Sequence, residues 1–313
     1  GFAPEEMGDF IVARPDGIPI YNFAVTVDDH LMGITHVIRG EEHLSNTPRQ
    51  LALYKAFNWV PPHFAHVPVV LAADRKKLSK RLHREAGLDV LHREGYLPEA
   101  LLNYVALLGW SPGDGREIMS PDELIRLFSL ERVSRGPAVF DLDKLNWMNE
   151  RYLRSYPVEH LKELLEPYLG ANQRVLGGEE HSPLPEVVIE LMRERASTLS
   201  GLAAECRSFL EPPVSLGPEE AGVLAEDTAS GVLGMFTEVL EAAPAGAVDW
   251  TALLDALRAR SGLGMRKVYM PIRVAVTARR HGPELPVMLG ILGRAEVLAR
   301  VQRSLAAPAK AVD

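Results

Sequence analysis

Two β-type apolar runs flank one predicted helix near the N-terminus, and this order constrains the fold more than any other feature. Residues 33–39 (GITHVIR) and residues 64–72 (FAHVPVVLA) are the two runs. The helix is predicted from Thr47, because Thr47 and Gln50 have the spacing of a capping box and Pro48 suits the first helical position. A strand–helix–strand order is typical of a parallel α/β sheet. We therefore expect part of such a sheet in this region.

The segment ahead of this unit predicts a β-hairpin. Two β-type runs, residues 10–13 and 18–27, flank the turn signal Pro15-Asp16-Gly17. In the helix that follows the first strand of the sheet, the apolar spacing predicts a buried stripe made of Leu51, Tyr54 and Phe57.

From about residue 91 the pattern becomes helical. Residues 98–108 begin with proline and are followed by Gly109, as expected for a helix. Further amphipathic helices are predicted over residues 121–128, 142–148, 185–209, 219–242, 250–260, 270–280 and 283–305, and a loop over 170–186. The fold class is therefore α/β plus all-α. We expect three regions: 1–90, 91–154 and 155–313.

Composition narrows the class of protein. Hydrophobic residues make up 47% and charged residues 24% of the 313, the mix of a globular protein. The single cysteine, Cys206, cannot form an internal disulfide, and no Cys/His group has zinc-ligand spacing, so we expect a cytoplasmic protein with no zinc site. No apolar run is long enough for a membrane helix, so no membrane partner is expected. The formal net charge of -8 argues against a generally basic nucleic-acid binder.

One cationic cluster stands out against this acidic background: Arg75, Lys76, Lys77, Lys80 and Arg81. Two lysines three positions apart on a loop after an apolar strand can place ammonium charges on neighbouring phosphate oxygens. Negative charge shifts there during nucleotidyl transfer, so Lys77 and Lys80 are candidate catalytic residues that act electrostatically. The alternative is a solvated basic loop.

Several long segments resemble bacterial glutamyl-tRNA synthetases, which are class I aminoacyl-tRNA synthetases. The sequence KLSKR at 77–81 resembles the KMSKS signature of that class, and residues 21–50, 95–115, 128–149 and 270–294 resemble other parts of the family in the same order. The resemblance implies the C-terminal half of a Rossmann-like catalytic domain with the KLSKR loop, a stem-contact or connecting helical region, and a helical anticodon-binding domain. It implies a glutamate–tRNA ligase that uses ATP with Mg²⁺, binds L-glutamate and tRNA(Glu), and is a monomer.

The resemblance also implies site residues. Tyr21 and Arg39 match positions that hold the glutamate substrate, and the planar fork of an arginine suits bidentate binding of a carboxylate. The alternative for Arg39 is a salt bridge to Glu41 or Glu42. The positions that match the family's ATP site are Glu42, His43, Val70, Lys77, Leu78, Ser79, Lys80 and Arg81.

Two departures from the family leave a second hypothesis open. The first signature of the class, HIGH, should precede residue 1, and residues 82–87 (LHREAG) replace the usual His-Gly after KLSKR. We expect the 313-residue chain to be the C-terminal two-thirds of an enzyme and to be inactive alone. The alternative is a non-catalytic tRNA-binding or regulatory fragment.

The helical region 155–313 holds 16 basic and 21 acidic residues, so tRNA binding there must depend on local features. Arginines can contact phosphates and also stack on unpaired bases. The candidate tRNA-binding residues are Arg193, Arg195, Arg266, Lys267, Arg279 and Arg280, and for each one alone a solvated helix face is the alternative.

Overall fold

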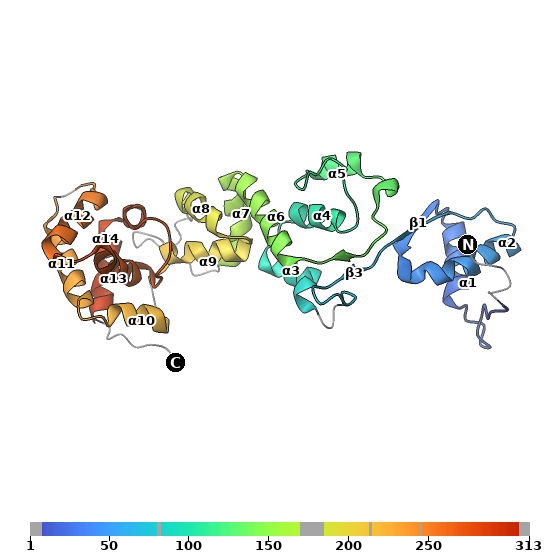
Figure 1. The fold of residues 1–313 in the computed structure, drawn as a ribbon, viewed down its shortest axis with the longest axis horizontal. Coiled ribbons are helices and arrows are strands. Elements are labelled where there is room, and N and C mark those ends of the chain that lie inside the picture. The colour runs from blue at the N-terminus through green and yellow to red at the C-terminus, as the bar shows by residue number, and fades with distance from the viewer. Residues whose placement is uncertain (1–7, 80–82, 170–184, 213–214, 245, 307–313) are drawn as a thin grey trace. The chain divides into compact units, whose positions relative to one another are not determined.

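The computed structural model describes residues 8–79, 83–169, 185–212, 215–244 and 246–306 (Figure 1). The chain divides into two compact units. Unit 1 comprises residues 1–91 and 98–148, and unit 2 comprises residues 92–97 and 149–313. The predicted boundaries of the three regions stay predictions. None of the helices in the described ranges is both long and apolar enough to cross a membrane.

Unit 1 contains the parallel strands that the sequence predicts. Strand β1 (His36–Gly40) pairs in parallel with β2 (His63–Val67), and helix α2 (Thr47–Ala56) lies between them in the chain. The register places Arg39 opposite His66. A second parallel pair joins β3 (Val70–Leu71) to β4 (Ala138–Val139). The α/β expectation is therefore confirmed.

The predicted strand over residues 18–27 is wrong. Only an antiparallel bridge between Ala13 and Pro19 remains of the hairpin, and helix α1 (Tyr21–Leu31) follows it. Asn22 and Thr26, one helical turn apart, are both buried, and Gln50 of α2 donates a hydrogen bond to Asn22 Oδ1 at 3.2 Å. Buried polar groups need such partners, and the Thr26 hydroxyl finds one within the helix, where it donates to the carbonyl of Asn22 at 2.8 Å.

The predicted capping box is also wrong. The N-cap of α2 is Asn46, with no side-chain cap, and the Thr47 hydroxyl instead accepts a hydrogen bond from Arg39. The buried residues of α2 are Gln50, Leu53 and Tyr54, whereas Leu51 and Phe57 are 41% and 40% exposed.

Helices complete unit 1 around the strands. Between β1 and α2 lies the 3-10 helix η2 (Glu41–Asn46), and the chain continues after β3 with η3 (Arg84–Ala86). The remaining elements are α3 (Leu88–Glu94), α4 (Pro98–Leu107), α5 (Pro121–Leu127), η4 (Leu130–Arg132) and α6 (Leu142–Ser155), of which α3 and α6 each end in unit 2.

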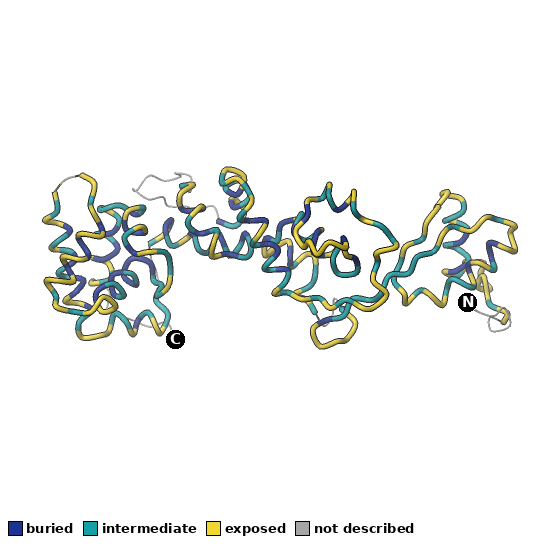
Figure 2. The backbone as a smooth tube through the Cα atoms, turned by 45° about the horizontal axis from the view of Figure 1, so that its top comes forward, coloured by how far each residue is buried: buried dark blue, intermediate teal, exposed yellow. Residues whose placement is uncertain are grey.

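All the named secondary-structure elements in the described part of unit 2 are helices, which confirms the all-α expectation. Its further elements are α7 (Val158–Leu169), α8 (Glu186–Met192), η5 (Arg193–Arg195), α9 (Leu199–Leu210), α10 (Pro218–Leu224), α11 (Ala229–Ala242), α12 (Trp250–Ser261), α13 (Met265–Thr277) and α14 (Leu285–Ala306). Buried positions recur along each of the longer helices (Figure 2). Two predicted helices are each broken in two. The span 185–209 is interrupted before Thr198, which caps α9 by accepting the Gly201 N–H, and the span 219–242 divides into α10 and α11.

Candidate functional site

Arg39 precedes Gly40, the last residue of strand β1, and its guanidinium is held by two side chains. Its Nε donates to Nε2 of His66 at 3.3 Å, and one Nη donates to the Thr47 hydroxyl at 2.9 Å. The guanidinium also lies 5.4 Å from the centre of the Phe64 ring, a distance that allows a cation–π contact. Within the described residues Arg39 makes no ion pair with Glu41 or Glu42, so the structure does not support the salt-bridge alternative. One edge of the fork is fixed by these two hydrogen bonds, and no other hydrogen bond of Arg39 is made within the described ranges, which leaves the remaining N–H groups to an acidic ligand.

Tyr21 begins helix α1 and is 55% exposed. Its ring centre lies 6.4 Å from that of His43 in η2, and His43 Nδ1 lies 3.4 Å from Asn46 Nδ2. The structure therefore brings together one predicted glutamate-binding residue and one predicted ATP-binding residue.

The basic loop is attached to strand β3 by backbone hydrogen bonds. Leu78 donates its N–H to the carbonyl of Val70 at 2.9 Å, and Ala72 donates to the carbonyl of Lys76 at 2.8 Å. The turn is tight enough that Arg75 takes a left-handed backbone conformation with φ 63°, which is uncommon outside glycine. The N–H of Ser79 donates to Nδ1 of His83 at 3.2 Å. Lys80 and Arg81 lie outside the described residues.

Lys77 and Glu42 contact each other directly. The Lys77 ammonium donates to Glu42 Oε1 at 2.9 Å, and this hydrogen bond is the main reason why the pKa of Glu42 lies below its usual range. The Glu42 carboxylate folds back over Gly40, where a Cβ atom would collide with it. Both side chains are substantially exposed, so the pair can open at little cost.

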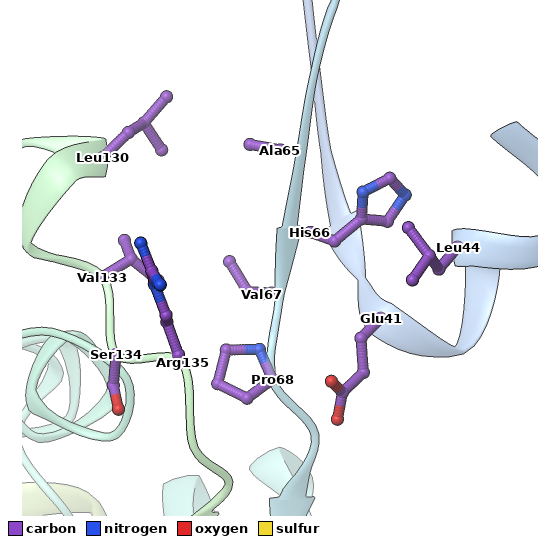
Figure 3. A pocket seen from close by; sticks show the side chains of 10 residues that line it. All are labelled: Glu41, Leu44, Ala65, His66, Val67, Pro68, Leu130, Val133, Ser134 and Arg135. Atoms are coloured by element: carbon purple, nitrogen blue, oxygen red, sulfur yellow. The ribbon is translucent and has the colours of Figure 1, made fainter. Parts of the chain in front are cut away.

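A cavity of about 290 Å³ lies beside strand β2 (Figure 3). Ala65 and Val67 line it from the strand, Pro68 just after the strand, Glu41 from η2, and Arg135 from the segment after η4. His66 also lines it, next to Leu44.

A cationic cavity of about 530 Å³ lies in unit 2. It is lined by three predicted tRNA-binding residues, Arg195, Arg266 and Arg280, and by Arg273. Burial, with a smaller contribution from the charge of Arg195, lowers the pKa of Arg273. Arg280 pairs with Glu219, but in the described part of unit 2 its buried Nε has no hydrogen-bond partner. Gathered guanidinium groups with unused donors can bind an anionic or aromatic ligand.

The other predicted tRNA-binding residues lie elsewhere. Arg193 donates to the carbonyl of Tyr156 and pairs with Glu190 at 2.6 Å. Arg279 donates to the carbonyl of Ala204 and pairs with Glu205 at 2.7 Å. Lys267 is exposed in the first turn of α13 and is not among the residues that line the cavity. Arg193 and Arg279 therefore already brace helices of unit 2.

Sequence reasoning missed Thr47, His66 and Arg273. The sequence predicts Thr47 as a helix cap. His66 belongs to no metal-like grouping of residues, so the sequence gives it no predicted role. Arg273 lies in a helix predicted from its apolar face. It follows Arg266 by seven residues, two helical turns, and this spacing is the signal that could have found it.

Comparison with known proteins defines the class of protein first. The family model described as tRNA synthetases class I (E and Q), catalytic domain, matches residues 1–147, and the one described as anticodon binding domain matches residues 160–305. The chain belongs to this class I tRNA synthetase family, and the predicted resemblance is confirmed.

The individual relatives carry a more specific name than the family model. The chain is 43% identical over 303 residues to the glutamate–tRNA ligase of Carboxydothermus hydrogenoformans, covering 96% of this chain and 63% of the relative. It is 42% identical over 308 residues to that of Geobacillus thermodenitrificans, with 97% and 63% covered.

Solved structures give the same result. A glutamate tRNA ligase from Elizabethkingia meningosepticum, in complex with its amino acid, superposes with a TM-score of 0.79 at 31% identity, covering 96% of this chain and 63% of that one. The glutamate-tRNA synthetase from Elizabethkingia anophelis gives a TM-score of 0.76 at 31% identity, with 97% and 63% covered. The chain thus spans a little under two-thirds of the length of these relatives.

Proposed function

We propose that this chain is part of a glutamate–tRNA ligase, which activates L-glutamate with ATP and transfers the glutamyl group to the 3′ terminal ribose of tRNA(Glu). One observation carries the proposal: residues 77–79 follow a turn that folds back on β3, and Lys77 contacts Glu42, which lies close in sequence to the anchored Arg39. The family match and the names of the relatives support it.

The proposed chemistry begins with adenylation. A carboxylate oxygen of glutamate attacks the α-phosphorus of ATP, and the bond to pyrophosphate breaks as the acyl–phosphate bond forms. Negative charge accumulates on the departing phosphates. Lys77, released from Glu42, and Lys80 stabilise that charge, which is the way protein groups accelerate phosphoryl and nucleotidyl transfer.

The remaining site residues bind the two substrates. Glu42, once it is freed from Lys77, accepts hydrogen bonds from the ribose hydroxyls, and His43 and the backbone of Val70 contact the nucleotide. Leu78, Ser79 and Arg81 position the loop over the phosphates. The open edge of Arg39 binds the side-chain carboxylate of glutamate, with the Tyr21 hydroxyl as a further donor.

Magnesium would accompany ATP in this scheme. In the described part of the chain, no group of three or more His, Cys, Asp or Glu residues could hold a metal ion. A divalent cation that keeps several waters and binds substrate phosphates needs no such protein cage. It neutralises phosphate charge when bound.

In unit 2 we propose that the cationic cavity contacts the anticodon of the tRNA. Unpaired anticodon bases present polar edges and faces to side chains, and Arg195, Arg266, Arg273 and Arg280 supply donors and planar cations for them. We further propose that the enzyme acts in the cytoplasm as a monomer.

Glutamate-dependent exchange of pyrophosphate into ATP tests the enzymatic proposal. The full-length protein that carries this chain should catalyse exchange with glutamate, and the 313-residue chain alone should not. Absence of exchange in the full-length protein, together with retained tRNA binding, would favour a non-catalytic tRNA-binding or regulatory role.

A further inference from the structure

We propose that His66 is a positioning residue, which fixes the guanidinium of Arg39 so that its outer N–H edge faces the side-chain carboxylate of the substrate. This inference rests on the proposed role of Arg39 in glutamate binding. It assigns a function to a histidine that lies on the neighbouring strand.

The hydrogen-bond pattern determines the state of the imidazole. Nε2 of His66 receives the Nε–H of Arg39 at 3.3 Å and lies 3.1 Å from the Thr47 hydroxyl. Arginine has donors only, so Nε2 must accept, and the ring proton of neutral His66 is therefore on Nδ1. The Thr47 hydroxyl accepts from an Nη of Arg39 and can donate its own proton to His66. His66 and Thr47 thus occupy one edge of the Arg39 fork.

The sheet makes this arrangement rigid. Arg39 and His66 are partners in the parallel register of β1 and β2, so the two backbones hold the side chains next to each other. Phe64, two residues earlier on β2, lies beside the guanidinium. A fork held on one edge has lost its rotational freedom before substrate arrives, and preorganisation of this kind improves affinity by lowering the entropy cost of binding.

Protonation of His66 would disrupt the arrangement. It would remove the lone pair that accepts from Arg39 and would place a second cation against the guanidinium. Burial, the charge of Arg39 and that of His43 lower the pKa of His66 below 6.5, which keeps it neutral at physiological pH. The charged groups that act on it are Arg39 on β1 and His43 on η2, while Thr47 contributes a hydroxyl from α2. Glu41 of η2 and Arg135 line the same cavity, and Arg135 lies on the other side of β2 from the His66 ring (Figure 3).

The test is the Michaelis constant for glutamate in pyrophosphate exchange by the full-length protein. We expect His66→Ala to raise KM for glutamate about tenfold, which is the scale of one charge-assisted hydrogen bond. The kcat and the KM for ATP should change less than about twofold. His66→Gln should restore most of the affinity, because its amide oxygen can accept where Nε2 did. His63→Ala, an exposed position on the same strand, is the matched control and should leave all three constants unchanged.

A pH series separates positioning from packing. In the wild type, KM for glutamate should rise as the pH falls below 6.5, and this rise should be absent in His66→Gln, which has no titrating ring. An unchanged KM in His66→Ala, or the same pH profile in His66→Gln, would overturn the inference. If either result is found while Arg39→Lys raises KM for glutamate, the inference about His66 fails but the proposed function is retained. An unchanged KM for glutamate in both His66→Ala and Arg39→Lys would contradict the glutamate-binding role of Arg39 itself. If His66→Ala does not fold, the pH profile of His66→Gln decides alone.

Discussion

At the residue scale, Arg39 illustrates how a side chain acquires a role from its neighbours. Thr47 and His66 take two of its donors, and Phe64 lies beside its plane. A lysine carries the same charge but has neither the planar fork nor the Nε–H that His66 accepts. We therefore expect glutamate binding at position 39 to require arginine itself and not only a positive charge.

Arg39→Lys should raise KM for glutamate in the full-length protein at least tenfold and reduce the preference for glutamate over glutamine. A single ammonium cannot bind both carboxylate oxygens in a fixed plane, and a poorly paired charged hydrogen bond costs about 1–3 kcal/mol. Steady-state exchange with each amino acid measures both effects. Wild-type constants in this variant would show that Arg39 only supports the strand.

Cys206 gives a second prediction at this scale. The side chain lies in α9 with no exposed surface, and burial raises the pKa of its thiol to about 12. Only the thiolate reacts with alkylating reagents. At pH 8 iodoacetamide should therefore leave the native chain unmodified and should alkylate the chain in guanidinium chloride, as mass spectrometry can show. Rapid alkylation of the native chain would mean that α9 opens readily.

At the element scale, Arg300 of α14 joins the ends of two other helices. Its Nη groups donate to the carbonyls of Ser208 and Phe209 near the end of α9 and of Val276 near the end of α13, at 2.6, 3.4 and 2.9 Å. Its Nε pairs with Glu296 at 2.6 Å. Carbonyls in the last turn of a helix lack partners and carry negative partial charge, so a buried cation satisfies both needs.

Arg300→Met should lower the free energy of unfolding of unit 2 by about 3 kcal/mol, because it leaves three carbonyls and one carboxylate without a buried partner. Thermal unfolding followed by circular dichroism should show the transition of unit 2 moving down by roughly 6–12 °C. Arg303→Met, an exposed position on the same helix, is the control and should change stability by less than about 0.5 kcal/mol. Equal shifts in the two variants would contradict the role of Arg300.

Most strands and helices were predictable from the sequence, whereas the side-chain hydrogen bonds that cap and connect them were not. The parallel strands and most helices follow from apolar periodicity and from proline and glycine at helix ends. The pattern predicts a strand over residues 18–27 because Phe23, Val25 and Val27 alternate like a strand, whereas residues 21–31 form helix α1. The hydrogen bond from Gln50 of α2 to the buried Asn22 is a contact between two helices, and the alternating pattern does not reveal it.

The site divides in the same way. The loop Lys77-Leu78-Ser79 and Arg39 could be found from the sequence by resemblance. The sequence around Thr47, however, does not indicate that its hydroxyl accepts a hydrogen bond from Arg39 and does not cap the helix that it begins. Arg273 was hidden among the apolar residues of α13.

At the scale of the whole molecule, the two units divide the proposed work. Unit 1 holds the groups proposed to bind glutamate and ATP, and unit 2 holds the cationic cavity. Arg266 is exposed on that cavity and makes no hydrogen bond or ion pair in the described part of the chain, so its donors are available to a nucleic acid.

Arg266→Ala in the full-length protein should weaken binding of tRNA(Glu) and reduce the slope of log affinity against log salt by about one, because one phosphate or base contact is lost. Filter binding at several salt concentrations measures this slope. Arg258→Ala on α12 is the matched control, since Arg258 is exposed but does not line the cavity. Equal losses with Arg266→Ala and Arg258→Ala would indicate a diffuse charge effect without a defined site.

The path of the chain through unit 2 has a consequence for biosynthesis. Residues 92–97 belong to this unit, although the next 51 residues belong to unit 1. The carbonyl of Gly95 accepts from Leu199, the N–H of Leu97 donates to Asn149, and a side chain at Gly95, which has φ 80°, would collide with Leu199. Translation adds about 5–20 residues per second, so on the order of ten seconds pass between the emergence of Gly95 from the ribosome and that of its partner about a hundred residues later. During that interval Gly95 lacks its native partner, and this contact within unit 2 can form only after Leu199, at the start of α9, has been synthesised.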